Sequence, residues 1–170
     1  MGDSNFEQNW RRQQELRMRP IADNIYRSCW GDNIKIERIE RLADFVLDKF
    51  FGIDVLVTFP TGMIITGQEK FLSPKYATYK SLTVEHMNDP SHKGDWFNLA
   101  SQFYFCGYAS KAWDSFQLWV IVNWLELALA TLQKNIKWFS NNNQHDNARA
   151  TFRYCRISEI PKECLIKRSN

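Results

Sequence analysis

The chain has 170 residues, of which 44% are hydrophobic and 24% charged, and its formal net charge is +3 at pH 7. This length can bury the core of one domain and is too short for two, so we expect a single domain over residues 1–170, and the composition is ordinary for a soluble globular protein. The mildly basic charge permits nucleic-acid binding without requiring it. The most apolar stretch, residues 118–132, is too short to span a bilayer, which predicts no membrane partner.

The cysteine pattern argues against a zinc ribbon or an iron–sulfur cluster, because no Cys-x-x-Cys pair is present. The first twenty residues are polar and rich in arginine, unlike a secretory signal. We therefore expect an intracellular protein with reduced thiols, located in the cytoplasm of a host cell and not secreted. The four cysteines are Cys29, Cys106, Cys155 and Cys164.

Helices are predicted for the N-terminal third of the chain, where good helix formers are followed by apolar side chains at three- and four-residue spacing. Pro20 should end the first helix, and Gly52 should end the last. The predicted helices cover residues 6–18, 21–29 and 34–50, with a turn at 31–33.

From residue 53 the sequence becomes rich in β-branched and aromatic residues, which favours strands. A turn at 60–62 should join the first two strands into a hairpin, and a polar loop should precede the third. The predicted strands cover residues 53–59, 63–72 and 81–87.

The C-terminal half is predicted to mix helices and strands. Asp95 can cap a helix over 96–109, because apolar residues in that segment fall on one helical face. The remaining predicted segments are a strand over 116–122 that is buried on both faces, a helix over 125–139, a polar mobile loop over 140–150, and one or two strands in the tail around Pro161.

The order of these elements is helix, three strands, helix and strand, with additions at both ends. Such an order gives an α/β sandwich in outline. We expect a core over 34–124, an N-terminal helical extension over 1–33, and a C-terminal helix, mobile loop and tail over 125–170.

The predicted hairpin gathers side chains that can hold a metal ion. Asp54 lies near the start of one strand, and Gln68 and Lys70 lie near the end of the next, on one face because side chains alternate. Glu85 can join them if the third strand pairs with the second. A hard cation, Mg²⁺ or Mn²⁺, prefers oxygen ligands, which these carboxylates, the amide and the backbone carbonyl of Glu69 can supply. Lys70 can orient or deprotonate the water that attacks a phosphodiester.

At these residues the chain resembles the PD-(D/E)XK nuclease superfamily. Gly52-Ile53-Asp54 stands for the motif aspartate, and Gln68-Glu69-Lys70 stands for the (D/E)-X-K triplet. The resemblance covers residues 34–124 and looks closest to phage and microbial nuclease-like proteins, whose pattern Gly94-Asp95-Trp96-Phe97 also matches. It implies a restriction-endonuclease-like αβββαβ core, an α/β fold with a central mixed sheet flanked by helices. It also implies a metal-dependent endonuclease that acts on DNA.

Gln68 departs from the superfamily pattern, because the triplet usually begins with an acid. A glutamine at this point occurs among active enzymes of the superfamily, so the resemblance is compatible with activity. Glu85 can compensate, whereas Glu69 should point to the opposite face of the sheet. The superfamily often adds an acid from the first helix, and the sequence does not choose among the candidates Glu37, Glu40, Asp44 and Asp48.

Basic and aromatic residues outside this group are candidates for nucleic-acid contact, although such residues are also common on solvated surfaces. The loop beside the site contributes Lys75, Tyr76, Tyr79 and Lys80, and the helix predicted after the third strand contributes Gln102 and Tyr104. The N-terminal helix contributes Trp10, Arg11, Arg12, Arg17 and Arg19, whereas His92 and His145 lie in polar loops and are expected to be solvated.

The leading hypothesis is therefore a metal-dependent nuclease whose partner is DNA. A homodimer is compatible with it, because cutting two strands usually takes two active sites. The alternative, motivated by Gln68, is a nuclease-fold protein that has lost catalysis and binds nucleic acid or a protein partner. A third hypothesis is an α/β interaction protein that uses its Trp- and Phe-rich surface.

Overall fold

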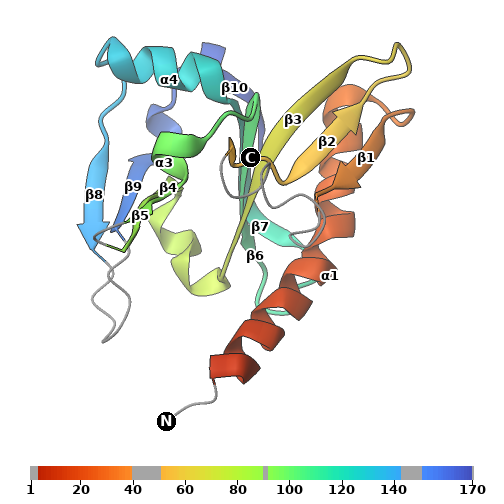
Figure 1. The fold of residues 1–170 in the computed structure, drawn as a ribbon, viewed down its shortest axis with the longest axis horizontal. Coiled ribbons are helices and arrows are strands. Elements are labelled where there is room, and N and C mark those ends of the chain that lie inside the picture. The colour runs from red at the N-terminus through yellow and green to blue at the C-terminus, as the bar shows by residue number, and fades with distance from the viewer. Residues whose placement is uncertain (1–3, 40–50, 90–91, 143–150, 170) are drawn as a thin grey trace.

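The computed structural model describes residues 4–39, 51–89, 92–142 and 151–169. A central β-sheet forms the middle layer, with a long helix on one face and a second sheet on the other (Figure 1). The chain is thus a mixed α/β protein with few helices, and the expected mixed central sheet is confirmed.

The central sheet has the strand order β1-β2-β3-β6-β7-β10. β3 and β6 run parallel and all other neighbours run antiparallel, which makes the sheet mixed. Its strands are β1 (Lys35–Arg38), β2 (Val55–Thr58), β3 (Ile64–Leu72), β6 (Phe103–Ala109), β7 (Phe116–Asn123) and β10 (Leu165–Arg168).

The second sheet has the strand order β5-β4-β9-β8. It packs against the central sheet, because Leu82 and Val84 of β4 share one core with Tyr104 and Cys106 of β6. This face of the central sheet was expected to carry helices and instead carries strands. They are β4 (Ser81–Asp89), β5 (His92–Lys93), β8 (Phe139–Asn142) and β9 (Thr151–Arg156).

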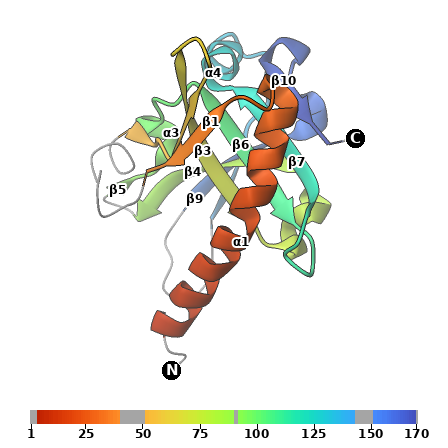
Figure 2. The same cartoon turned by 90° about the vertical axis from the view of Figure 1, so that its right-hand side faces the viewer.

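The opposite face of the central sheet is covered by α1 (Ser4–Trp30), as Figure 2 shows. Ala22 and Tyr26, one helical turn apart, are fully buried in a core with Val55 of β2 and Phe103 of β6. The sheet therefore has two cores, one beneath α1 and one facing the second sheet, so its inner strand β6 is buried on both sides.

The prediction that Pro20 ends a first helix is wrong, because α1 continues through it. Met18, Ala22 and Tyr26 are fully buried at four-residue spacing, whereas Pro20 lies on the exposed side. Packing of this continuous apolar stripe outweighs the one helical hydrogen bond that proline cannot donate.

Two further helix predictions differ from the structure. Lys35–Arg38 forms strand β1, and residues 40–50 lie outside the described residues. In the segment 96–109, only Asp95–Asn98 is helical (α3), and Phe103–Ala109 is strand β6. All seven residues of β6 are buried, so the strand lacks the alternation that distinguishes it from a buried helix.

The predicted hairpin is confirmed, with β2 and β3 antiparallel around a turn at 60–62. The third predicted strand exists as β4, but it pairs with β5 and β9 rather than with β3. The predicted strand over 116–122 is confirmed as β7, although only its residues 120–122 are buried in succession.

The C-terminal part contains more strand than expected. α4 (Trp124–Leu132) ends earlier than predicted, because the chain then forms β8, and residues 143–150 of the predicted loop lie outside the described residues. The predicted tail strands are confirmed as β9 and β10. The short 3-10 helices are η1 (Pro74–Tyr79), η2 (Ile157–Glu159) and η3 (Lys162–Cys164). No helix within the described part of the chain has the length and apolar character needed to cross a membrane.

Candidate active site

The hairpin places Asp54 and Gln68 side by side on the face of the central sheet that lies toward the second sheet. Val55 pairs with Gly67, and Asp54 N donates a 2.8 Å hydrogen bond to Gly67 O, so Asp54 stands next to Gln68. Val55 is fully buried in the core beneath α1. Since neighbouring side chains alternate, Asp54 is directed away from α1.

Gln68 and Lys70 share this face. In the parallel pair of β3 and β6, they lie beside Tyr104 and Cys106, and both of those residues belong to the core between the two sheets. The ammonium of Lys70 and the carboxylate of Asp54 are therefore on the same side of the sheet, as the hairpin predicts.

The side-chain oxygen of Gln68 is the most unusual polar atom of this group. Gln68 is 7% exposed, and its Oε1 has no hydrogen-bond partner among the described residues. A buried polar atom without a partner costs about 1–3 kcal/mol, so such atoms often mark the place of an ion or water. Gly52, with φ at +56°, makes room here, since a Cβ on it would lie 2.8 Å from Leu99 Cδ1 and 3.4 Å from Gln68 Oε1.

The carboxylate of Asp54 accepts a backbone hydrogen bond from β3 beyond the point where its pairing with β2 ends. The β2–β3 ladder ends at Val55, while β3 continues to Leu72. At this point Asp54 Oδ2 accepts a 3.0 Å hydrogen bond from the backbone N–H of Glu69. The main chain of Glu69, whose carbonyl is a predicted metal ligand, is thereby held beside the carboxylate.

Glu85 reaches the site by a different route from the one predicted. It was expected to arrive through pairing of β4 with β3, but in the structure it lies opposite Phe152 in the β4–β9 pair. From there Glu85 Oε2 lies 4.0 Å from Lys70 Nζ, across the two sheets, with the side chains 23% and 20% exposed respectively. The second sheet thus contributes an acid to a group that otherwise comes from one hairpin.

Glu69 lies on the opposite face, as the alternation of β3 requires. Its carboxylate accepts hydrogen bonds from Tyr26 Oη at 2.8 Å and from Arg38 Nε at 2.9 Å. Arg38 also donates to Asp23 Oδ1 at 2.6 Å. Burial alone would lower the pKa of Arg38, but the charges of Glu69 and Asp23 raise it, so the guanidinium stays charged. Glu69 is therefore committed to a buried network beneath α1 and does not face the site.

A third acid, Asp95, lies near the same group. Burial raises the pKa of the Tyr104 phenol well above its ordinary value, and the charges of Asp95, Asp54 and Glu85 are among those that raise it further. From the sequence, Asp95 was assigned only as a helix cap; the Gly94-Asp95-Trp96 pattern was the signal that pointed to more.

Gly94 allows α3 to approach Glu85 closely. A Cβ on Gly94 would lie 2.8 Å from the carbonyl oxygen of Glu85 and 2.9 Å from its Cγ. Gly94 N also donates a 2.9 Å hydrogen bond to His86 O. A larger residue at position 94 would push β4 and α3 apart, and with them the carboxylates of Glu85 and Asp95.

Several other candidates have structural partners or lie on the surface. Gln102 precedes β6 rather than lying on a helix, and its Oε1 accepts a 3.0 Å hydrogen bond from Thr66 N. Tyr104 is fully buried, and its hydroxyl donates to Thr83 O at 2.8 Å. Trp10, 48% exposed, packs edge-on against Trp113 with ring centroids 5.8 Å apart.

Among the candidate acids of the first helix, only Glu37 is described. It lies in β1, where its exposed carboxylate pairs with Lys35 at 2.9 Å. Asp44, Asp48 and Glu40 lie outside the described residues, as does His145.

The loop predicted to contact nucleic acid forms η1, which is largely exposed. Tyr76 and Tyr79 are 37% and 68% exposed, and their rings stack with centroids 6.4 Å apart. Lys75 Nζ lies 4.7 Å from the centre of the Tyr76 ring.

The donors at the site suit a hard cation, although they are few. In the part of the chain that the structure describes, no group of three or more His, Cys, Asp or Glu side chains is placed to hold a metal ion. Asp54 and Gln68 nonetheless offer a carboxylate and a buried, unsatisfied amide oxygen, and Mg²⁺ commonly uses one or two carboxylates and keeps several waters. Comparisons with protein-family models, curated proteins and solved structures found no match for this chain.

Proposed function

We propose that this protein is a metal-dependent nuclease of the PD-(D/E)XK type that hydrolyses phosphodiester bonds in DNA. The site consists of Asp54, Gln68, Lys70 and Glu85. One observation carries the proposal: the buried Oε1 of Gln68 has no partner among the described residues and lies on the same face as Asp54, which directly precedes β2, and Lys70, two residues farther along β3. A cation bound there would satisfy this oxygen.

The course of the chain supports a restriction-endonuclease-like fold. The hairpin β2–β3 is followed by a crossover to β6, which runs parallel to β3, and then by the antiparallel strand β7. A helix was expected in the crossover. The segment η1, β4, β5 and α3 takes that position here, and it brings in Glu85.

Each residue has a role that follows from its chemistry. Asp54 and Gln68 would hold Mg²⁺ or Mn²⁺ through oxygen atoms, with the Glu69 carbonyl nearby. When bound, the cation supplies a Lewis acid and lowers the pKa of a water molecule. Lys70 balances the negative charge that develops on the phosphate and orients the attacking water. Glu85, 4.0 Å from Lys70, positions the ammonium group.

The test is cleavage of supercoiled, single-stranded and branched DNA by purified protein with Mg²⁺ or Mn²⁺. Asp54→Asn can still accept the hydrogen bond of Glu69 N, so it should fold normally but lose activity by about 100-fold or more, as should Lys70→Met. Glu37→Gln, at an exposed acid of β1, is the matched control and should cut like the unaltered protein. Absence of cleavage on all three substrates, or full activity of Asp54→Asn, would refute the enzyme.

The second candidate is a nuclease-fold protein without catalysis that binds nucleic acid or a protein partner. Two observations favour it: a glutamine occupies the acidic position of the triplet, and the described residues contain no group of three acids, histidines or cysteines placed for a metal. Calorimetry with Mg²⁺ and Mn²⁺ separates the two candidates. No heat of metal binding, together with salt-sensitive DNA binding, would favour the second.

A further inference from the structure

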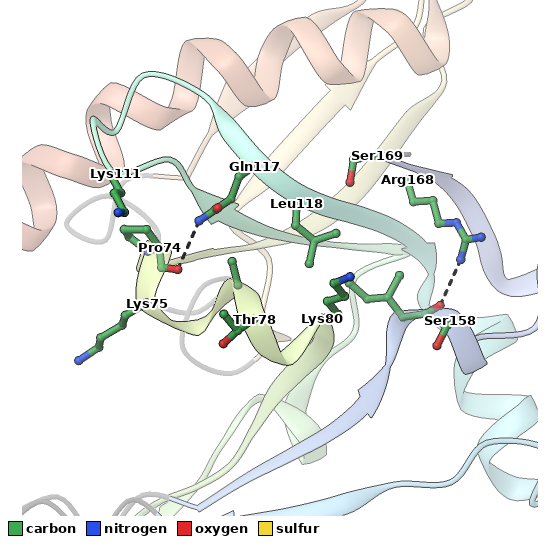
Figure 3. A pocket seen from close by; sticks show the side chains of 12 residues that line it. Pro74, Lys75, Thr78, Lys80, Lys111, Gln117, Leu118, Ser158, Arg168 and Ser169 are labelled. Carbon is green, nitrogen blue, oxygen red and sulfur yellow. Dashed lines mark hydrogen bonds between the residues drawn. The ribbon is translucent and has the colours of Figure 1, made fainter.

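A cationic region lies just beyond the C-terminal end of β3, around η1. There the surface is hollowed into a cavity of about 1010 Å³. Its wall comes from η1, the β6–β7 connection, the start of β7, η2 and the end of β10 (Figure 3). Four basic side chains, Lys75, Lys80, Lys111 and Arg168, line the cavity, and no lining residue is acidic.

The positive charge of this cavity has no acidic side chain among the lining residues to offset it. None of the four cations forms an ion pair with any residue in the described ranges. The two acids close in sequence are not within ion-pair distance of these cations: Asp114 accepts hydrogen bonds from Ser110 and Ser115, and Glu159 faces Arg156 at 3.5 Å. The cavity therefore presents a positive potential to solvent, which attracts polyanions.

The four cations are spread along the cavity, and hydrogen bonds fix the segments that carry them. In the view of Figure 3, Lys75 and Lys111 lie at one end, Arg168 lies at the other, and Lys80 lies between them. Gln117 Nε2 donates to Pro74 O at 3.3 Å and fixes η1 against β7, while Arg168 Nη1 donates to Ile157 O at 3.4 Å. Such a spread suits several phosphates in a row better than one.

We infer that this cavity binds the sugar–phosphate backbone of a nucleic acid. Four cations can each contact a different phosphate, and the exposed hydroxyls of Thr78 and Ser158 add hydrogen-bond donors that suit phosphate oxygens. The volume lies at the upper end of the roughly 300–1,000 Å³ typical of small-molecule pockets, so an extended ligand fits it better than a single anion.

The neighbouring tyrosines distinguish a nucleic acid from a simple polyanion. Tyr76 and Tyr79 form an exposed stacked pair on η1, the same short helix whose Lys75 and Thr78 line the cavity. Exposed aromatic rings next to a basic groove are the arrangement on which bases stack when a protein holds a single strand.

This inference deepens the proposed function and rests on it for the choice of nucleic acid as the ligand. β3, which carries Gln68 and Lys70, leads directly into η1. At about 3.3 Å per residue, Lys70 and Pro74 lie about 13 Å apart along the chain. A nucleic acid lying in the cavity would thus pass within a few nucleotides of the candidate active site.

The experiment measures binding without cleavage. Fluorescence anisotropy in EDTA, over a range of NaCl concentrations, compares labelled single-stranded DNA, duplex DNA and RNA of one sequence, with inorganic polyphosphate as a competitor. The variant is Lys80→Gln/Lys111→Gln, in which glutamine retains most of the side-chain length at two exposed positions. The matched control is Lys35→Gln/Lys137→Gln, which removes the same charge from exposed positions outside the cavity. Circular dichroism and thermal melting verify folding.

We expect the cavity variant to bind at least one of the nucleic acids about tenfold more weakly at low salt. Its salt slope should fall by about 0.7–0.9 for each phosphate that the variant no longer neutralises, while the control pair changes neither quantity. Equal weakening by both pairs, no weakening by either, or binding of polyphosphate alone would each overturn the inference. Binding in EDTA tests the cavity alone, because no metal ion is present and no cleavage occurs. Cleavage with Mg²⁺ or Mn²⁺ tests the catalytic site, and Asp54→Asn should lose cleavage while it binds normally in EDTA. The two proposals can therefore fail separately.

Discussion

At residue 68 the chain buries an amide oxygen that no described neighbour satisfies. If the oxygen serves a metal, removing it should favour the fold while impairing function. We predict that Gln68→Leu raises the free energy of unfolding by about 1–2 kcal/mol and abolishes binding of Mg²⁺ and Mn²⁺. Urea denaturation and calorimetry measure the two quantities.

Gln102 supplies the control for that prediction, because its side-chain oxygen is satisfied by Thr66 N at 3.0 Å. Gln102→Leu removes a hydrogen bond that holds β3, and should lower the free energy of unfolding by about 1 kcal/mol. If Gln68→Leu were also destabilising, the oxygen of Gln68 would have a partner in solution and the argument for a cation there would fail.

Glu69, the neighbour of Gln68 in β3, should show the opposite effects on stability and on metal binding. Its side chain is 6% exposed and that of Arg38 is 11% exposed, and the two form a buried ion pair at 2.9 Å. In Glu69→Gln the Arg38 guanidinium keeps Asp23 as an ion-pair partner but loses Glu69. This change should lower the free energy of unfolding by about 3 kcal/mol. Metal binding should not change, because Glu69 faces α1.

The same change at an exposed pair provides the comparison. Lys35 and Glu37 have side chains 70% and 51% exposed, so Glu37→Gln should alter stability by less than about 1 kcal/mol. Chemical denaturation of both variants tests the contrast. A loss of metal affinity in Glu69→Gln would mean that the two faces of β3 are not independent.

At the scale of the element, α1 shows packing prevailing over local preference. Pro20 is exposed within a helix whose buried residues continue on both sides of it. Pro20→Ala restores a backbone donor and should stabilise the protein by about 1–3 kcal/mol in thermal and urea unfolding. Asn24→Ala, one turn farther along the exposed side, should gain only about 0.5 kcal/mol. Destabilisation by Pro20→Ala would show that a bend at Pro20 is needed for α1 to fit the sheet.

Elements with local sequence signals could be predicted, and elements that depend on tertiary burial could not. The β2–β3 hairpin could be predicted because its turn and its β-branched strands are local signals, and with it the common face of Asp54, Gln68 and Lys70. β6 could not be predicted, because a strand buried on both faces shows the same uninterrupted apolar character as a buried helix.

Residues brought in from the second sheet were harder to place. Glu85 was identified as a candidate, but its route through β4 and β9 depends on which strands pair, and pairing is not a local property of the sequence. The sequence predicts Asp95 as the cap of a longer helix, and this prediction is wrong, because α3 has four residues, its N-cap is Gly94 and Asp95 lies in its first turn. The cationic cavity around η1 joins five separate segments, so only its η1 part could be anticipated.

At the scale of the whole molecule, the two sheets enclose thiols that must stay neutral. Cys106 of β6 and Cys155 of β9 are fully buried in the core between the sheets. Burial raises the pKa of Cys106 from 9.0 to about 11 and that of Cys155 from 9.0 to about 12. Between pH 9 and the raised pKa of each thiol, the unfolded chain loses a proton that the folded protein keeps, so the folded state is progressively disfavoured as pH rises.

The contribution of these thiols to stability is therefore fully present below pH 9 and is lost between pH 9 and pH 11–12. We predict that the free energy of unfolding falls above pH 9, with a slope of up to about 1.4 kcal/mol per pH unit for each thiol. Urea denaturation at successive pH values measures the slope. Cys155→Ala should reduce it, whereas Val84→Ala, which shortens a non-titrating side chain of the same core, should lower stability equally at every pH. An unchanged slope in Cys155→Ala would mean that water reaches the space between the sheets and that the second sheet packs less tightly than the shared core indicates.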